Sequence, residues 1–302
     1  MNWTEKYRPS SVAGIIGQTR FCDDATSWVE RNDMPNICLY GNAGTGKTTA
    51  AYALANEILG EHFSSCFKEI NASQDRRLDT IRETVTNFAS WKSTDEVPFK
   101  IILMDELDGM TKDAQRALKR TMERAHNVRF IITCNNQHNV EYPIRSRCAN
   151  YWFQPLAVDV MVLLLQDISL QENYEVDVDE LEQFCEALNG DLRRGINELQ
   201  ACAFSKSNLS EKTKEFMNNY TEIIRHLIEG NCTSANKLLL KEVYSGKNVK
   251  EIANNLHHCV LEMDMNRVKR FKCLSSVGEM EWRSNSMTPK ILVSWLAAQF
   301  IE

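Results

Sequence analysis

Short apolar runs alternate with helical patterns in the first half of the chain. Apolar runs of strand length occupy residues 36–40, 99–104 and 129–134. Residues 50–59, which follow the first run, have the composition of a helix. Strands that alternate with helices are typical of a mostly parallel sheet covered by helices on both faces. The pattern therefore predicts an α/β domain over residues 1–154.

The pattern changes to helices alone after residue 155. Leu181, Phe184, Cys185 and Leu188 repeat at the spacing of one helix face, and similar stripes recur over 223–228, 235–243 and 249–263. We therefore expect two helical regions after the α/β domain, over residues 155–207 and 208–302. The connection between them is predicted over 206–213. With 302 residues, the chain is long enough for two domains and a small third one.

The distribution of charge supports the same three regions. The chain as a whole has a net charge of −6, which on average argues against coating nucleic acid by bulk charge. Residues 1–154 hold 19 basic and 19 acidic side chains, 155–207 hold 3 and 11, and 208–302 hold 13 and 11. The negative charge thus comes from the middle region, and the average hides a neutral first domain.

Composition excludes several classes of protein. The longest uninterrupted apolar run, residues 160–165, is far shorter than the ~20 residues of a membrane span. The first residues contain no hydrophobic signal core, and the ten cysteines form no Cys-x-x-Cys pair. We therefore expect an intracellular protein with reduced thiols, cytoplasmic in a prokaryote or archaeon, nuclear in a eukaryote, and in the host cell for a virus.

A glycine-rich segment carries the strongest chemical signal. It fits the pattern G-x-x-x-x-G-K-[ST] and joins a predicted strand to a predicted helix, which is the context of a phosphate-binding loop. Glycines let backbone N–H groups turn toward phosphate oxygens, and the helix N-terminus adds favourable partial charge. Lysine would reach the outer phosphates and the first threonine would bind Mg²⁺. The residues are Gly41, Asn42, Ala43, Gly44, Thr45, Gly46, Lys47 and Thr48, with Thr49 directly after.

Two carboxylates follow the second predicted strand. Asp105 and Glu106 lie where the strand ends, and ligands of open α/β sheets bind at this edge. Asp105 is a candidate Mg²⁺ partner, and Glu106 is a candidate base that orients the attacking water. These residues and the loop predict a Mg²⁺-dependent nucleoside triphosphatase, without indicating what its energy is used for.

Further segments, in the order in which they occur along the chain, narrow the class of protein. Taken together, they make the chain resemble the small subunit of replication factor C, the AAA+ clamp loader of eukaryotes and archaea, which has relatives in some virus genomes. The resemblance is strong over residues 1–205, and beyond that it rests on helical pattern and length. The segments are Glu5-Lys-Tyr-Arg-Pro9, Asn71-Ala-Ser73, Asn135, Ser146-Arg-Cys148 and Gly190-Asp-Leu-Arg-Arg194.

The resemblance implies roles for individual residues. Asn135 matches sensor 1, a polar side chain aimed at the γ-phosphate and the water. Arg193 matches sensor 2, which contacts the γ-phosphate in its own subunit. Arg147 matches the arginine finger, which acts on ATP held by the neighbouring subunit and offers planar donors to a phosphoryl group that gains charge. The adenine pocket is matched by Thr4, Tyr7, Arg8, Pro9, Ile15, Ile16 and Gly17.

A basic helix face is the candidate DNA surface. Residues 111–125 carry a small or apolar stripe on one side of a predicted helix and basic residues on the other. Taken alone, this pattern is also typical of a solvated helix face. The resemblance implies that the helix follows the DNA backbone, with contacts to phosphates rather than bases. The candidate residues are Lys112, Arg116, Lys119 and Arg120, together with Arg76, Arg77 and Arg82 from an earlier segment.

The resemblance implies an ATPase subunit that loads a ring-shaped sliding clamp onto primer–template DNA. Its expected cofactors are ATP and Mg²⁺, and its expected partners are a large subunit, further small subunits, the clamp and DNA, with no membrane. The lid would span 155–207 and an oligomerising collar 208–302. Two alternatives remain open: another AAA+ DNA-processing ATPase, and an ATP-bound structural subunit that does not hydrolyse. The first is disfavoured because 208–302 shows no hairpin pattern of a winged helix.

Overall fold

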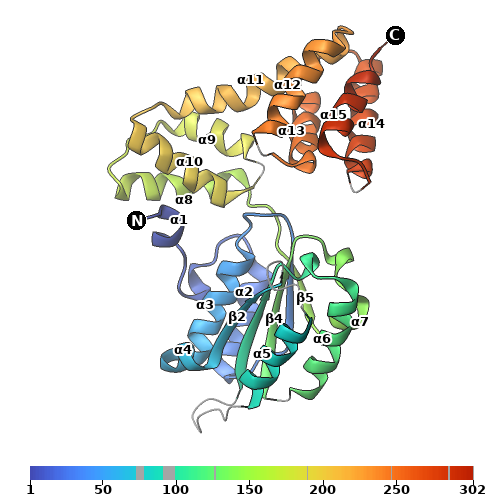
Figure 1. Cartoon of the computed structure of the whole chain (residues 1–302). Coiled ribbons are helices and arrows are strands. Elements are labelled where there is room, and N and C mark those ends of the chain that lie inside the picture. The colour runs from blue at the N-terminus through green and yellow to red at the C-terminus, as the bar shows by residue number, and fades with distance from the viewer. Residues whose placement is uncertain are drawn as a thin grey trace. The chain divides into compact units, whose positions relative to one another are not determined.

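The computed structural model describes residues 1–72, 78–90, 99–125, 127–188, 190–245, 247–284 and 286–301. The chain divides into two compact units, Met1–Lys206 and Ser207–Glu302 (Figure 1). Among the described residues, no helix combines the length and apolar character that crossing a bilayer requires.

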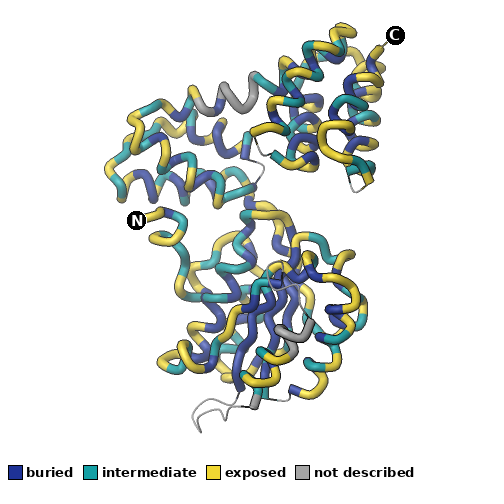
Figure 2. The backbone as a smooth tube through the Cα atoms, viewed as in Figure 1, coloured by how far each residue is buried: buried dark blue, intermediate teal, exposed yellow. Residues whose placement is uncertain are grey.

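A parallel five-stranded sheet lies at the centre of the first unit. Its strand order is β2-β3-β4-β1-β5, and every pair of neighbours is parallel. Figure 2 shows the strands as a mostly buried layer. The three strands expected from apolar runs form, with bounds shifted by one residue, and two further strands lie at the edges. The strands are β1 Ile37–Tyr40, β2 Phe67–Asn71, β3 Lys100–Asp105, β4 Val128–Cys134 and β5 Ala149–Trp152.

Alternate side chains of the strands enter two separate cores. Ile37, Leu39 and Ile101 pack with helices α2 and α3, whereas Cys38 and Ile102 pack with helices α5 and α6. Burial on both faces explains why these strands are continuous apolar runs rather than alternating ones. The predicted α/β fold with a parallel sheet is confirmed. The helices are α2 Thr19–Arg31, α3 Lys47–Leu59, α4 Phe63–Cys66, α5 Leu78–Ser90, α6 Lys112–Arg124 and α7 Tyr142–Arg145.

Short segments complete the first unit, beginning with the N-terminal helix α1 Trp3–Lys6. Four 3-10 turns connect the longer elements. They are η1 Val12–Gly14, η2 Gly60–His62, η3 Leu107–Gly109 and η4 Gln137–Asn139.

Three helices follow the sheet within the first unit: α8 Val158–Gln171, α9 Val178–Ala187 and α10 Leu192–Ser205. The stripe expected from the sequence is buried here, with Leu181, Phe184 and Cys185 fully inaccessible. Two aspartates begin helices in this acidic region, since Asp177 caps α9 and Asp191 caps α10 through backbone N–H groups. Carboxylates at helix N-termini also interact favourably with the positive end of the helix dipole. Part of the negative charge of this region therefore stabilises its helices.

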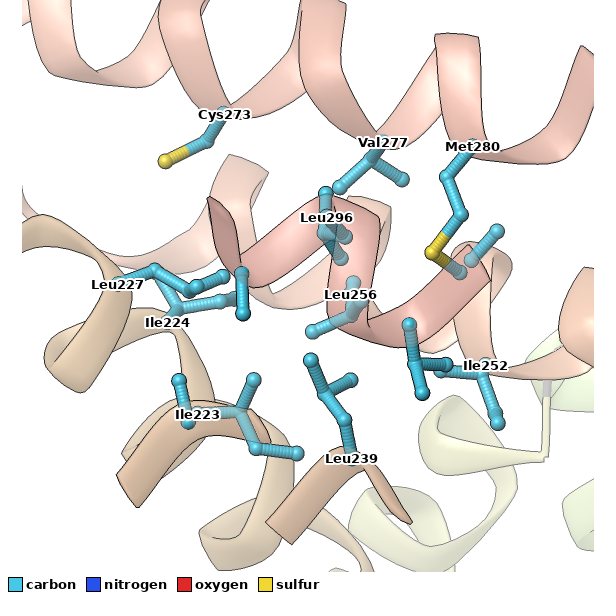
Figure 3. Close-up of a cluster of buried hydrophobic side chains, with 14 of the residues drawn as sticks. Ile223, Ile224, Leu227, Leu239, Ile252, Leu256, Cys273, Val277, Met280 and Leu296 are labelled. Carbon is cyan, nitrogen blue, oxygen red and sulfur yellow. The ribbon is translucent and has the colours of Figure 1, made fainter. Parts of the chain in front are cut away.

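In the second unit, the described residues form five helices around one apolar core. Leu239, Leu256 and Leu296 come from three different helices and point toward one another (Figure 3). The connection expected over 206–213 is wrong in its second half, because the first helix already begins at Leu209, where Leu209 and Thr213 are buried. The helices are α11 Leu209–Ile228, α12 Cys232–Tyr244, α13 Val249–Glu262, α14 Arg267–Arg283 and α15 Pro289–Ala298.

Candidate nucleotide site

The phosphate-binding loop joins β1 to α3. Gly44 and Gly46 adopt φ values of 76° and 90°, a left-handed conformation that residues with a side chain rarely adopt. α3 begins without a side-chain cap at its N-terminus. The N–H groups of its first turn have no acceptor within the helix, so they are available to an anion in the loop.

Lys47 lies at the start of α3 and is nearly buried. Its ammonium group donates to the carbonyl oxygens of Gly41 and Asn42, at 2.8 and 2.7 Å, and to Oδ1 of Asn135 at 3.1 Å. Burial lowers the pKa of Lys47 below its usual value of 10.5. Phosphate oxygens beside this group would favour its charged form, so the loop and the lysine fit a polyphosphate.

Asp105 is the centre of a second set of contacts at the end of β3. Its Oδ1 accepts a hydrogen bond from the hydroxyl of Thr48 at 2.9 Å and another from the hydroxyl of Thr133 at 2.6 Å. The carboxylate therefore lies directly beside the first threonine of α3. A hydroxyl and a carboxylate oxygen are the ligand types that Mg²⁺ takes in proteins, so these residues fit the ion.

Glu106 directly follows in a left-handed conformation with φ 55°, and its side chain is exposed. Its backbone N–H donates to the Thr133 hydroxyl at 3.0 Å. Asp108 accepts the backbone N–H groups of Asn135 and Asn136 at 3.1 and 3.0 Å. These bonds fix the ends of β3 and β4 to each other and hold Glu106 and Asn135 at one edge of the sheet.

Two cavities surround the loop. The larger, of about 590 Å³, is lined by residues of the loop and by apolar side chains that include Ile15, Leu156, Leu164 and Ile196. The smaller, of about 80 Å³, lies between the loop and the strand ends. The size of the larger cavity and its mixture of polar and apolar lining residues are typical of small-ligand sites, and the apolar side chains suit a purine base.

Most sequence-predicted nucleotide residues line these cavities. Arg193 lines both, and it reaches them from the first turn of α10. Gly17, Gly41 and Asn42 line neither; Gly41 and Asn42 instead support Lys47 through their carbonyl groups. The larger cavity is lined by Thr4, Tyr7, Arg8, Pro9, Ile15, Ile16, Gly44, Thr45, Gly46, Thr48, Thr49 and Asp105, and the smaller by Ala43, Lys47, Glu106 and Asn135 among others.

The N-terminal segment is tied to the helices that follow the sheet. The backbone N–H of Trp3 donates to Gln200 of α10 at 3.0 Å. The carboxylate of Glu172, just after α8, accepts from Lys6 at 2.7 Å and from the Tyr7 hydroxyl at 2.8 Å. These hydrogen bonds, first that of Lys6, lower the pKa of Glu172. These contacts tie the N-terminal segment, whose Thr4 and Tyr7 line the larger cavity, to α10, whose Arg193 and Ile196 also line it.

Arg147 lies away from this cavity, in the exposed turn after α7. Its guanidinium donates to the carbonyl oxygen of Pro143 at 2.6 Å and to the carboxylate of Glu123 in α6. The next residue, Cys148, packs against the core, and burial raises the pKa of its thiol to about 12. Cys148 therefore anchors the turn to the core, while Arg147 stays at the surface.

The candidate DNA residues of α6 lie on the outer face of the helix. Lys112, Arg116 and Arg120 are exposed, and Lys119 is half-buried. Arg116 pairs with Asp113 at 3.2 Å, so part of its charge is compensated. Arg76 and Arg77 fall outside the described residues. Arg82 falls within α5, and nothing about its side chain is described.

Several residues of the site were missed by the sequence reasoning. Thr133 was treated as part of a strand, although its hydroxyl joins Asp105 to the Glu106 backbone. Asp191 caps α10 and packs so closely on the loop that a Cβ at Gly44 would lie 1.8 Å from its Oδ1. Its position after a glycine and before a helical pattern is the available signal, that of an N-cap. Gln115 is fully buried in α6 and had no signal, because its partners come from two loops, one just before the helix and one after β4.

Residues 37–156 match the family model described as "ATPase family associated with various cellular activities (AAA)". The phosphate-binding loop and the strand-end carboxylates described above lie within this range. The fold and site therefore define the chain as an AAA ATPase.

Relatives narrow this class. The chain is 35% identical to the replication factor C small subunit of Haloarcula marismortui, over 93% of this chain and 89% of that protein. It is also 35% identical to the replication factor C small subunit of Methanothermobacter thermautotrophicus, over 99% of this chain and 97% of that protein. The chain belongs to the replication factor C small subunit family.

Solved structures support the fold. The RuvB Holliday junction branch migration motor of Thermotoga maritima superimposes with a TM-score of 0.59, covering 83% of this chain and 85% of that one. The two sequences are 16% identical, so the likeness concerns the fold alone.

Proposed function

We propose that the chain is an ATP-dependent subunit of a sliding-clamp loader in DNA replication. ATP binding opens the ring-shaped clamp and grips primer–template DNA, and hydrolysis releases the clamp on DNA. The observation that carries this proposal is a set of phosphate-loop, strand-end and helix residues around two cavities that share lining residues, in a chain 35% identical to replication factor C small subunits over nearly its whole length.

In this proposal the nucleotide is ATP, with its phosphates on the loop and its base against the apolar side chains of the larger cavity. Thr48 and Asp105 would hold Mg²⁺, which would supply positive charge beside the phosphate oxygens. Glu106 orients the attacking water, and Asn135 and Arg193 face the γ-phosphate. Three contacts support this arrangement: the Thr48–Asp105 pair, the Lys47–Asn135 bond, and the common lining by Arg193.

The competing function is a structural subunit that binds ATP without hydrolysis. Glu106→Gln removes the carboxylate but keeps its size, so we expect a loss of turnover with ATP binding retained. If wild-type and variant assemblies hydrolyse ATP at the same low rate, the structural-subunit reading replaces ours.

We propose that Arg147 is an arginine finger that acts on ATP in the neighbouring subunit. Its exposed position away from the chain's own cavity supports this role. Because each site then needs a neighbour, assembly and hydrolysis are coupled. Arg147→Ala leaves ATP binding by its own subunit unchanged and lowers turnover in the assembly; full activity of the variant assembly contradicts the assignment.

We propose that the outer face of α6 contacts the DNA backbone, together with Arg76, Arg77 and Arg82. The exposure of Lys112, Arg116 and Arg120 supports the contact. Lys112, Arg116 and Lys119 changed together to Glu should weaken stimulation of turnover by DNA while basal turnover persists. Unchanged stimulation excludes this helix from DNA binding.

The helical regions have separate roles in the proposal. Residues 155–207 form a lid over the nucleotide, and residues 208–302 form a collar that packs against other loader subunits. The lid role is supported by Arg193 and Ile196, which line the larger cavity from α10.

The decisive experiment measures ATP turnover of this chain with its large subunit, with and without primer–template DNA and candidate clamp. Joint stimulation by DNA and clamp supports clamp loading. If branched DNA stimulates ATP turnover and the clamp leaves the rate unchanged, the chain is part of a different AAA+ DNA motor.

A further inference from the structure

The guanidinium of Arg147 is held at both of its terminal nitrogens. Nη1 donates to the carbonyl oxygen of Pro143 at 2.6 Å, and Nη2 donates to the carboxylate of Glu123. The same carboxylate oxygen lies 3.8 Å from Nζ of Lys119, one helical turn earlier on α6. Two acceptors on different segments therefore define the plane of the guanidinium.

Both acceptors are mounted on firmly packed supports. Leu118 and Met122 of α6 pack into the apolar core that the sheet forms with α5 and α6. The turn that carries Pro143 and Arg147 is anchored by Ile144, which is fully buried. Glu123 and Arg147 remain at the surface between these anchors, with side-chain exposures of 42% and 36%.

This exposure indicates what the pair does. An ion pair that is this exposed contributes little to folding stability, because water screens it and two long side chains lose rotamer freedom. Its effect is geometric, since it orients a side chain that otherwise samples many rotamers. The guanidinium has five N–H donors and uses two here, which leaves three for a phosphate.

We propose that Glu123 is a positioning residue for Arg147, which orients the guanidinium toward the phosphates of the neighbouring subunit before the subunits meet. This inference rests on the proposed trans role of Arg147. A finger oriented in advance reaches the transferring phosphoryl group with less loss of freedom, so the gain appears in the chemical step rather than in ATP binding.

The test compares kcat and KM for ATP in loader assemblies at saturating DNA. Glu123→Ala lowers kcat by about tenfold, the order expected for a misplaced catalytic group, and leaves KM within about twofold. Glu123→Gln retains an acceptor oxygen and restores most of kcat. Glu30→Ala is the control, because it removes an exposed acid of α2, outside the nucleotide site, the α6 surface and the Arg147 turn, and its kcat equals that of the wild type.

A double variant separates this inference from the proposed function. In the Arg147→Ala background, Glu123→Ala has no further effect if Glu123 acts through the arginine. If Arg147→Ala itself leaves kcat unchanged, the finger assignment fails. If Arg147→Ala abolishes turnover but Glu123→Ala equals the wild type, Glu123 has no positioning role. Faster turnover in Glu123→Ala means that the carboxylate restrains the finger, which also overturns the inference.

Discussion

The hydroxyl of Thr133 connects the two carboxylate-bearing positions at the end of β3, and its removal tests the site directly. It donates to Asp105 at 2.6 Å and accepts the backbone N–H of Glu106 at 3.0 Å, from a side chain only 1% exposed. Thr133→Val keeps the shape of the side chain and its preference for strands, but removes both hydrogen bonds. No cavity forms, so the change isolates the hydroxyl.

The expected loss of stability follows from these two bonds. Leaving the part-buried N–H of Glu106 without an acceptor costs about 1 kcal/mol, the lower end of the cost for a buried donor, and a hydrogen bond to a charged carboxylate contributes about 1.5–3 kcal/mol. Thr48 still donates to Asp105, which offsets part of the second amount. We therefore expect the variant to be destabilised by about 3 kcal/mol. For a unit of 206 residues this lowers the unfolding temperature by about 6–12 °C.

Thermal unfolding of the isolated chain, followed by circular dichroism, measures this effect. Thr133→Ser is the matched control, because it keeps the hydroxyl and loses only a methyl group, at about 1 kcal/mol. In the assembly, the valine variant also needs about 10- to 100-fold more Mg²⁺ for half-maximal turnover, since Asp105 loses the group that orients it. The reasoning is refuted if the valine and serine variants unfold at the same temperature and share one Mg²⁺ dependence.

Three further predictions concern other parts of the chain. Gly44→Ala weakens binding of a fluorescent ATP analogue by about tenfold, because a Cβ strains the left-handed backbone and meets Asp191; unchanged affinity contradicts this. Glu242→Ala lowers the free energy of unfolding of the second unit, measured by urea denaturation, by about 3 kcal/mol, because Lys247 loses its buried carboxylate partner. A decrease below about 1 kcal/mol contradicts this prediction. Burial raises the pKa of Tyr151, so the unfolded chain loses this proton first and stability falls above the ordinary tyrosine value of about 10. The stability of Tyr151→Phe should therefore decrease less steeply with rising pH than that of the wild type in alkaline unfolding titrations. Identical slopes for the two proteins contradict this prediction.

The sequence predicted those features that neighbouring residues determine. The loop from Gly41 to Thr48 is contiguous, and the three central strands are predominantly apolar because both of their faces are buried. Strands β2 and β5 were missed. They lie at the sheet edges, and exposed residues such as Lys68 and Asn150 interrupt their apolar pattern.

Contacts between segments that are far apart in the chain could not be predicted from the sequence pattern. Thr133 is significant because β3 and β4 are neighbours in register, which places its hydroxyl beside Asp105. The side chain of Gln115 interrupts an apolar stripe, and its burial depends on the carbonyl groups of Leu107, Met110 and Asn139. No spacing rule brings these groups together, since they meet only when the tertiary fold forms.

The attachment of the N-terminal segment to α10 and to Glu172 has a mechanical consequence. The chain connects the sheet to the helices after residue 157 directly, through residues 153–157. It connects them a second time through residues 8–10, where Asn56 of α3 donates to the carbonyl oxygen of Ser10 at 3.1 Å. If α8–α10 move as the proposed lid, two separate connections define an axis for that movement while these bonds persist, and α1 travels with the helices. The direction in which the larger cavity could open is then restricted by residues such as Glu172 and Gln200, which do not line it.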